Sequence, residues 1–488
     1  MRNISRKAAF MLALLLAFSA ASCGDTAESS TEKTNRVGNT SEITETSTEK
    51  LTDKVPDVKF DGKEFRTIEQ NSNINPLGLE ESDGDVVNDA VCDSARKAED
   101  RFDVKIVPTT LIVYGELSKA VMKAVMSDSD EYDLVFGQMF KSGSDAQQGI
   151  YMEWQKVPYV NFENPWYVKS INDATVGDKL YMIESELSMT YHKQTWMIVY
   201  NKTKAGEIAD FPDLYKMVED GTWTIDQLYK LSSDVYHDLN GDGNRDDNDF
   251  YGIYGSTDAC MLASFVAGME GKIVGVDKDL KVNTYINSEK TIDILSKLSK
   301  LFVSSDGALQ PAESKRKYRM ERFTNGKVIF EAMQANDLVS PDFNMRNLSD
   351  EFGVLPLPKY DADQTEYYTM VDGGASVMLI PKTVRNADMV GALVEAMSAD
   401  YYYNVTPVYI GVAIGQKGTR DEESIRIMRE IFDSRVIAFD YLYDGFKGWV
   451  MQLPTLIKDE NTIASGIQRQ LGAMKAYYES VVDFLTAK

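Results

Sequence analysis

The chain has 488 residues, of which 43% are hydrophobic and 10% aromatic, and its formal net charge at pH 7 is −24. A chain of this length exceeds what one hydrophobic core usually serves, so two or more globular lobes are expected. The strong negative charge argues against a basic patch that neutralises phosphates, and therefore against nucleic-acid binding, and it is typical of a soluble extracellular protein.

Residues 1–22 have the pattern of a secretory signal peptide. A basic start precedes an apolar segment over residues 8–18, which is too short to span a membrane comfortably. Small residues then lead directly to Cys23, an arrangement that resembles the lipobox of bacterial lipoproteins, although Ala20 stands where that family usually has leucine. We expect cleavage before Cys23 and lipid attachment to its thiol, and plain secretion is the alternative.

Residues 23–56 are predicted to be a disordered tether. The segment contains no aromatic residue and is dominated by Ser, Thr, Glu and Lys, so it cannot bury enough apolar surface to fold. Behind a lipid anchor, such a segment would hold a folded body away from the membrane.

Strand and helix patterns alternate at the start of the folded body. Apolar residues step by three or four along residues 87–102, which predicts an amphipathic helix that buries Cys92. The alternation predicts a parallel sheet with crossover helices, and ligands bind beyond the carboxyl ends of such strands, here residues 69–71 and 137–139. The predicted order is strand, helix, strand, helix and strand, over residues 58–70, 87–102, 104–108, 115–127 and 132–138.

The remaining chain has further strand patterns separated by helices. Residues 213–237 predict a helix, a turn and a second helix, and apolar residues line one face of a long helix over residues 463–485. The predicted strands lie at residues 195–202, 250–255, 323–333, 351–360 and 373–381.

The segment "DLNGDGNRDDND", residues 238–249, has oxygen-bearing side chains at alternate positions, as calcium loops do. We expect it to hold one Ca²⁺ as a structural clip, with Gly243 permitting the sharp turn. A solvated acidic loop is the alternative, and a dockerin module would need two such loops at a chain end. The predicted metal ligands are Asp238, Asn240, Asp242, the carbonyl group of Asn244, and Asp249.

Several of these segments, taken in order, resemble the extracellular solute-binding lipoproteins of ABC importers, in particular the large sugar-binding type related to maltose-binding protein. The segments that carry the resemblance are "YDLVFGQ", "NPWYVKS", "MIVYNKTKAGE", "GTWTIDQLYKLS", "DLNGDGNRDDNDFYGI", "FTNGKVIFEAM" and "EFGVLPLPKY". The resemblance covers roughly residues 58–488.

The resemblance implies a two-lobed α/β fold of the type II periplasmic-binding-protein kind, with solute bound in a cleft that closes by a hinge motion. It places lobe 1 at residues 57–192 plus 353–400 and lobe 2 at residues 193–352 plus 401–488. The chain would cross between the lobes near residues 190–197, near 352–360 and at about 400.

Sugars offer apolar faces and many hydroxyl groups, so a sugar cleft needs aromatic platforms and polar partners. Trp166, Trp196 and Trp449 are the predicted platforms, with core packing as the alternative for each. The polar candidates, chosen for their positions next to strand ends or glycines, are Gln138, Glu331 and Asp372, with a solvated loop position as the alternative.

No catalytic residue is predicted. The chain has only two histidines, His192 and His237, and neither lies in a recognisable nucleophile or zinc motif. The sequence therefore predicts a monomeric receptor, lipid-anchored on the extracellular face of the bacterial cytoplasmic membrane, that delivers an oligosaccharide to the permease of an ABC transporter. A secreted carbohydrate-active hydrolase, or a receptor for a peptide or another non-sugar solute, is the alternative.

Overall fold

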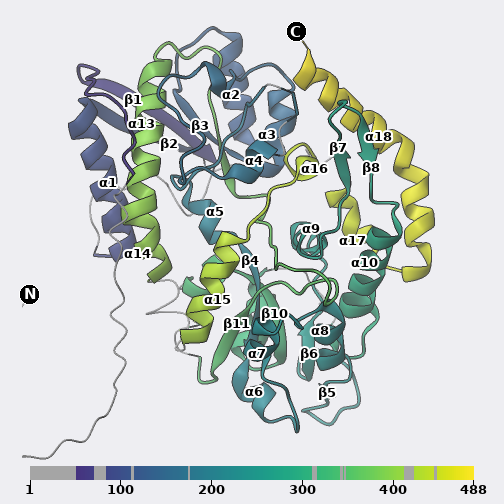
Figure 1. The fold of residues 1–488 in the computed structure, drawn as a ribbon. Coiled ribbons are helices and arrows are strands. Elements are labelled where there is room, and N and C mark those ends of the chain that lie inside the picture. The colour runs from purple at the N-terminus through teal and green to yellow at the C-terminus, as the bar shows by residue number, and fades with distance from the viewer. Residues whose placement is uncertain are drawn as a thin grey trace, which may run out of the picture. The chain divides into compact units, whose positions relative to one another are not determined.

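The computed structural model describes residues 51–70, 84–111, 115–173, 176–177, 179–309, 316–340, 345, 348–411, 422–444 and 448–487. The predicted signal peptide, the lipid site at Cys23 and most of the predicted tether lie outside these residues. Residues from Thr52 to the C-terminus form one unit, and it contains two main sheets (Figure 1).

The first sheet has the strand order β12-β3-β1-β2. β1 (Lys63–Gln70) lies parallel to both β2 (Val104–Leu111) and β3 (Leu134–Gln138), while β12 (Ser376–Leu379) lies antiparallel to β3. This confirms the predicted parallel arrangement of the first three strands, and the one strand that arrives from far along the chain is antiparallel.

Two amphipathic helices connect the parallel strands of the first sheet. In α1 (Val86–Phe102) the predicted apolar face is buried and Cys92 is 1% exposed. Asp85 caps the first turn, and α1 ends where Asp103 adopts a left-handed conformation. α2 (Glu116–Met126) packs on β1, and α13 (Ala387–Asp400) runs beside α1 (Figure 1).

The second sheet has the order β11-β4-β10-β6-β5, with β9 (Ala308–Leu309) also paired to β6. β10 (Val328–Gln334) is parallel to β6 (Phe250–Tyr254) and antiparallel to β4 (Trp196–Asn201). β11 (Phe352–Leu355) and β5 (Tyr236–His237) pair antiparallel at the two ends. Every residue of β4, β6 and β10 is buried, as expected for central strands covered on both faces.

Helices cover these sheets and join them. A short hairpin of β7 (Val274–Val276) and β8 (Val282–Thr284) lies beside the C-terminal helix α18 (Ile463–Thr486) (Figure 1). The other helices are α3 (Met139–Ala146), α4 (Lys169–Asp173), α5 (Met189–Lys193), α6 (Lys202–Gly206), α7 (Leu214–Glu219), α8 (Ile225–Ser232), α9 (Ala259–Gly268), α10 (Glu289–Ser299), α11 (Arg316–Thr324), α12 (Ala335–Val339), α14 (Thr406–Ile410), α15 (Glu422–Asp433), α16 (Phe439–Leu442) and α17 (Leu453–Leu456).

Two predicted boundaries differ from the structure. β11 belongs to the second sheet, so the chain returns to the first sheet between Leu355 and Ser376, later than the predicted start of the returning segment at residue 353. The third crossing also comes later than residue 400, because α14 still contacts α1 whereas α15 contacts β11. Strand pairing decides the first boundary and helix packing decides the second, and the sequence pattern specifies neither.

The predicted tether also ends earlier than residue 56. Asp53 forms an ion pair with Arg101 at 2.7 Å, and Val55 is 7% exposed against the hydrophobic core. The last residues of the predicted tether are therefore held against α1, which contains Arg101.

None of the helices in the described ranges is both long enough and apolar enough to cross a membrane.

Candidate functional site

The carboxyl ends of the central strands lie where the chain crosses between the sheets. In the first sheet β3 ends at Gln138, opposite the start of β12. In the second sheet β6 and β10 are parallel and end at Tyr254 and Gln334. Strand ends of this kind are where α/β proteins bind ligands, so this edge is the first candidate site.

One linking segment, residues 369–375, ties these edges together. Val371 bridges to Thr195, and the Thr369 hydroxyl donates a hydrogen bond to the carbonyl oxygen of Trp196 at 2.8 Å. Phe140 N–H, at the start of α3, donates to the carbonyl oxygen of Gly373 at 3.1 Å. A Cβ atom on Gly373 would lie 2.7 Å from the Cβ of Phe140, so only glycine permits this close approach.

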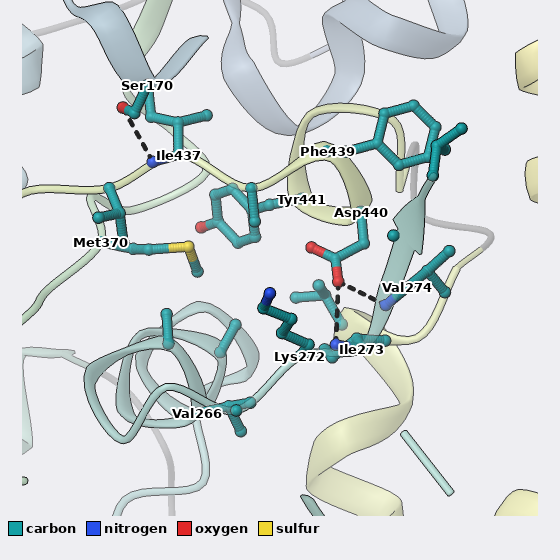
Figure 2. A pocket seen from close by; sticks show the side chains of 18 of the residues that line it. Ser170, Val266, Lys272, Ile273, Val274, Met370, Ile437, Phe439, Asp440 and Tyr441 are labelled. Carbon is teal, nitrogen blue, oxygen red and sulfur yellow. Dashed lines mark hydrogen bonds between the residues drawn. The ribbon is translucent and has the colours of Figure 1, made fainter. Parts of the chain in front are cut away.

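A cavity of about 390 Å³ lies next to this segment (Figure 2). Its walls come from α9, from β7 and residues 271–273 before it, from Ser170 of α4 and from residues 436–441. Val176, Met370 and Val450 complete the lining. A cavity of this size is of the kind that holds small ligands.

The lining of the cavity is mostly aliphatic, and Asp440 and Lys272 are its charged side chains. Asp440 is 5% exposed, and its Oδ2 atom accepts hydrogen bonds from the N–H groups of Ile273 at 3.1 Å and Val274 at 2.7 Å. Burial raises the pKa of Asp440 to about 6, although these N–H donors act in the opposite direction. Asp440 thus carries a carboxylate that is ionised at neutral pH only against a desolvation cost.

Tyr441 separates the cavity from a second group of polar side chains. Its hydroxyl donates to the carbonyl oxygen of Val371 at 3.1 Å. Beyond it lies the acidic cluster, which we define as Asp258, Cys260 and Asp372, with one oxygen or sulfur atom of each within 4.8 Å of the others. Asp258 caps α9 by accepting from two backbone N–H groups at 3.0 Å.

The acidic cluster could in principle hold a metal ion, but its thiol is poorly suited to that role. Burial, followed by the nearby Asp372 and Asp258, raises the pKa of Cys260 well above its usual value. Metals bind the thiolate form. The carboxylates of Asp258 and Asp372 are better suited to accept hydrogen bonds from hydroxyl or ammonium groups of a solute.

A buried ion pair network links the two sheets at the crossing. Arg435, just after α15, donates to His192 Nδ1 at 3.2 Å, and His192 Nε2 lies 2.7 Å from Glu186. Because arginine can only donate, His192 Nδ1 must accept, so the proton is on Nε2 and the imidazole is neutral. The Thr406 hydroxyl donates to the same Glu186 oxygen at 2.6 Å.

The pKa directions agree with this assignment. Burial lowers the pKa of His192 despite the adjacent Glu186. For Glu186, burial opposes ionisation, but His192, Arg435 and Thr406 together lower its pKa. The network therefore consists of an ionised carboxylate and a guanidinium that are joined through a neutral histidine, and it fastens α5, α14 and the segment after α15 to one another.

Of the predicted ligand-binding residues, two lie beside the crossing with partly exposed side chains. Gln138 is at the end of β3, and Asp372 belongs to the acidic cluster. Glu331 is 0% exposed, because β10 continues past it to Gln334 and places it inside the second sheet rather than in a loop. Any contact of Glu331 with ligand stays a prediction.

The three predicted aromatic platforms are covered by protein atoms. Trp166 and Trp449 are 0% exposed and Trp196 is 1% exposed. As they lie, none of the three indoles offers a face on which a sugar could stack, so solute contact stays a prediction that requires neighbouring side chains to move. Trp223, another buried tryptophan, donates from its indole N–H to the carbonyl oxygen of Pro356 at 2.9 Å.

The sequence did not single out Asp258, Lys272, Asp440 or Tyr441. Asp258 could have been found, because it follows the end of the predicted strand at residues 250–255 and precedes an apolar helix, as a capping residue does. Asp440 and Tyr441 lie in a four-residue helix that has no periodic signal.

The predicted calcium loop forms the expected turn but does not gather its carboxylates. Gly243 has the left-handed φ of 74° that the turn requires, and Asp238 accepts from the N–H groups of Gly241 and Gly243 at 2.7 and 2.9 Å. Asp249 is buried and accepts from the Tyr236 hydroxyl at 3.0 Å. Within the described ranges, the only group of three acidic, thiol or imidazole side chains that converge is the acidic cluster, and the predicted ligand set of the loop also includes the Asn240 side chain and the carbonyl group of Asn244.

Calcium binding at this loop stays a prediction that melting curves can check. Loops of extracellular modules bind Ca²⁺ with dissociation constants of about 10⁻⁴–10⁻³ M, so millimolar Ca²⁺ would add at most about 1–2 kcal/mol to the free energy of unfolding. We expect a higher melting temperature in calcium than in chelator, and no such difference for Asp238→Asn. Equal melting temperatures for the wild-type protein would exclude the clip.

Comparison with known proteins identifies neither a matching family model nor a matching curated protein. Solved structures do match. A cyclo/maltodextrin-binding protein in complex with maltotetraose has a TM-score of 0.53 and 14% identity, covering 88% of this chain and 99% of its own. The galacto-N-biose- and lacto-N-biose I-binding protein of a Bifidobacterium longum ABC transporter has a TM-score of 0.53 and 14% identity, covering 86% and 98%.

An ABC substrate-binding protein of Listeria monocytogenes in complex with cycloalternan is similar at a TM-score of 0.51 and 15% identity, covering 84% of this chain and all of its own. Identities this low establish the fold alone, and they agree with the two sheets and the crossings described above. The chain therefore has the two-lobed α/β fold found in the sugar-binding proteins of ABC transporters, as the sequence predicted.

Proposed function

We propose that the protein is an extracellular receptor that captures a solute, with an oligosaccharide favoured, between its two lobes and delivers it to the permease of an ABC importer. The observation that carries the proposal is the fold, which sugar-binding proteins share, and the chain also has a cavity of about 390 Å³ next to the linking segment. The receptor would act as a monomer and close by rotation about the crossing segments.

The arrangement of the histidines supports binding rather than catalysis. Both ring nitrogens of His192 are engaged, one by Glu186 and one by Arg435, so neither can take a proton from a serine. His237 stacks on Phe250, with ring centroids 5.7 Å apart. A secreted hydrolase stays the second candidate function, and direct assay separates the two.

Calorimetry with maltodextrins, cyclic glucans and lacto-N-biose-type disaccharides tests the proposal. We expect one of these classes to bind saturably with 1:1 stoichiometry, to leave no product after prolonged incubation, and to raise the melting temperature, since a ligand at 100 times its dissociation constant adds about 2.7 kcal/mol. Release of shorter sugars would instead support the hydrolase. Saturable binding of peptides alone would keep the receptor and change its solute.

We propose in addition that Cys23 carries a lipid that holds the protein at the outer face of the cytoplasmic membrane. A diacylglyceryl group supplies two acyl chains, which suffice for stable anchoring where one is marginal. Cys23→Ala is expected to move the protein from the membrane fraction to the medium, with Cys92→Ala as the matched control. Retention of the Cys23→Ala protein at the membrane, with no lipid adduct on the wild-type protein, would refute the anchor.

A further inference from the structure

The two charged side chains of the cavity, Asp440 and Lys272, differ in their exposure to solvent and therefore in how much each would gain from an oppositely charged partner. Asp440 is almost fully buried, and its Oδ2 atom accepts hydrogen bonds from two backbone N–H groups. Lys272 is exposed to solvent, and its ammonium group also lies 5.9 Å from the ring centre of Tyr285. Both side chains extend toward the same space (Figure 2), but within the described residues no ion pair of 4.0 Å or less joins Asp440 to any basic side chain.

A cation that enters the cavity would therefore gain more from Asp440 than an anion would gain from Lys272. The Asp440 carboxylate has already lost most of its water, so pairing it with a cation costs little further desolvation on the protein side. Asp444, four residues on, adds less, because burial and, to a smaller extent, Asp440 raise its pKa to about 7, so that its carboxyl group is only partly ionised near neutral pH. The Lys272 ammonium would have to give up water to bind an anion.

The rest of the lining favours carbon over hydroxyl groups. The Ser170 hydroxyl accepts a hydrogen bond from Ile437 N–H at 3.2 Å, and the Tyr441 hydroxyl donates to Val371. A unit with several hydroxyls would lose hydrogen bonds to water that these walls do not replace, and each buried unpaired group is costly. Aliphatic walls such as Ala267 and Val274 instead suit a carbon ring or chain.

We propose that the cavity is a subsite for a protonated amine borne on a carbon-rich ring or chain, which pairs with the Asp440 carboxylate, and hence that the solute belongs to the amine-bearing class. Naming the solute in this way rests on the proposed receptor function, whereas the subsite itself does not. The acidic cluster lies on the other side of Tyr441 and would add to the preference for a cationic solute.

Three probes with the same six-membered carbon ring test the subsite: cyclohexylamine, cyclohexanol and cyclohexanecarboxylate, titrated against the protein and followed by NMR at pH 7.5. We expect the amine to bind at least tenfold more tightly than the alcohol, and the carboxylate to bind most weakly. Equal affinities, or tightest binding of the carboxylate through Lys272, would overturn the proposal.

Two variants locate the binding. Asp440→Asn retains an oxygen to accept from Ile273 and Val274 but removes the charge, so it should abolish the tenfold preference for the amine. Ala267→Phe retains Asp440 and fills the cavity, so it should remove binding of all three probes. Asp279→Asn is the matched control, because Asp279 lies in the exposed turn between β7 and β8, and it should leave the preference for the amine unchanged. Amine binding that persists in Ala267→Phe would place it elsewhere and refute the subsite.

The same experiment separates this inference from the receptor function. Binding of neutral oligosaccharides without binding of cyclohexylamine would leave the receptor and refute the subsite. Binding of cyclohexylamine without binding of any neutral or amine-bearing sugar would retain the subsite and refute the oligosaccharide receptor.

Discussion

Trp196→Ala is expected to lower the free energy of unfolding by about 3–5 kcal/mol, the usual loss when a fully buried tryptophan is truncated. Trp196 begins β4, is 1% exposed and lies opposite Gln334 of β10. Its carbonyl oxygen also accepts the hydrogen bond from Thr369 that ties the linking segment to the second sheet. Urea unfolding followed by circular dichroism at pH 7 measures the change.

Trp196→Phe is the matched control, since it keeps an aromatic ring in the same space and should cost clearly less than the alanine variant. The sequence alone predicts something different, namely a ring that stacks on solute, whose loss would weaken binding by about 1–3 kcal/mol and leave the fold intact. An alanine variant of wild-type stability with weakened solute affinity would therefore support the sequence-based prediction and contradict the structural one.

Asp444→Asn is expected to flatten the pH dependence of stability and to stabilise the protein above pH 7. Asp444 is 0% exposed, and its Oδ1 atom accepts from Val450 N–H at 3.0 Å and from the Tyr478 hydroxyl at 3.3 Å. Its Oδ2 atom is buried and has no hydrogen-bond partner among the described residues. Burial raises the pKa of Asp444 to about 7.

The direction of this pH dependence follows from the number of protons that the folded and unfolded states bind. Between the pKa of an unfolded aspartate, about 3.9, and the folded value of about 7, the folded state binds more protons than the unfolded state, so stability falls as pH rises through this window. From pH 5 to pH 8 this group alone should cost about 2–3 kcal/mol, and Asp444→Asn should remove that part of the slope. Part of the gain is offset because the new amide needs an acceptor.

Denaturant unfolding of both proteins at pH 5, 6, 7 and 8 measures the two slopes. Asp279→Asn, an exposed substitution of the same kind, should leave the slope of the wild-type protein unchanged. Parallel curves for the wild-type protein and Asp444→Asn would show that the carboxyl group of Asp444 is not the source of the pH dependence.

The sequence by itself was sufficient for the fold class and for most elements. The apolar spacing of residues 87–102 predicted α1 with its buried face, and the uninterrupted apolar strand at 132–138 predicted β3. Both signals are local. A helix that buries one face has apolar residues three or four positions apart, and a central strand that buries both faces has a continuous run of them. The resemblance of the quoted segments, in their order, to the solute-binding lipoproteins predicted the two-lobed architecture that the solved structures share.

Only the tertiary structure decided which side chains meet. Asp440 faces the hairpin residues Ile273 and Val274, and Asp258 meets Asp372, although more than a hundred residues separate the partners along the chain. The same packing buried Trp196, whose position at a crossing had suggested a cleft. Local periodicity describes which face of an element is apolar, but the pairing of distant strands determines what covers that face, so the site had to be read from the assembled sheets.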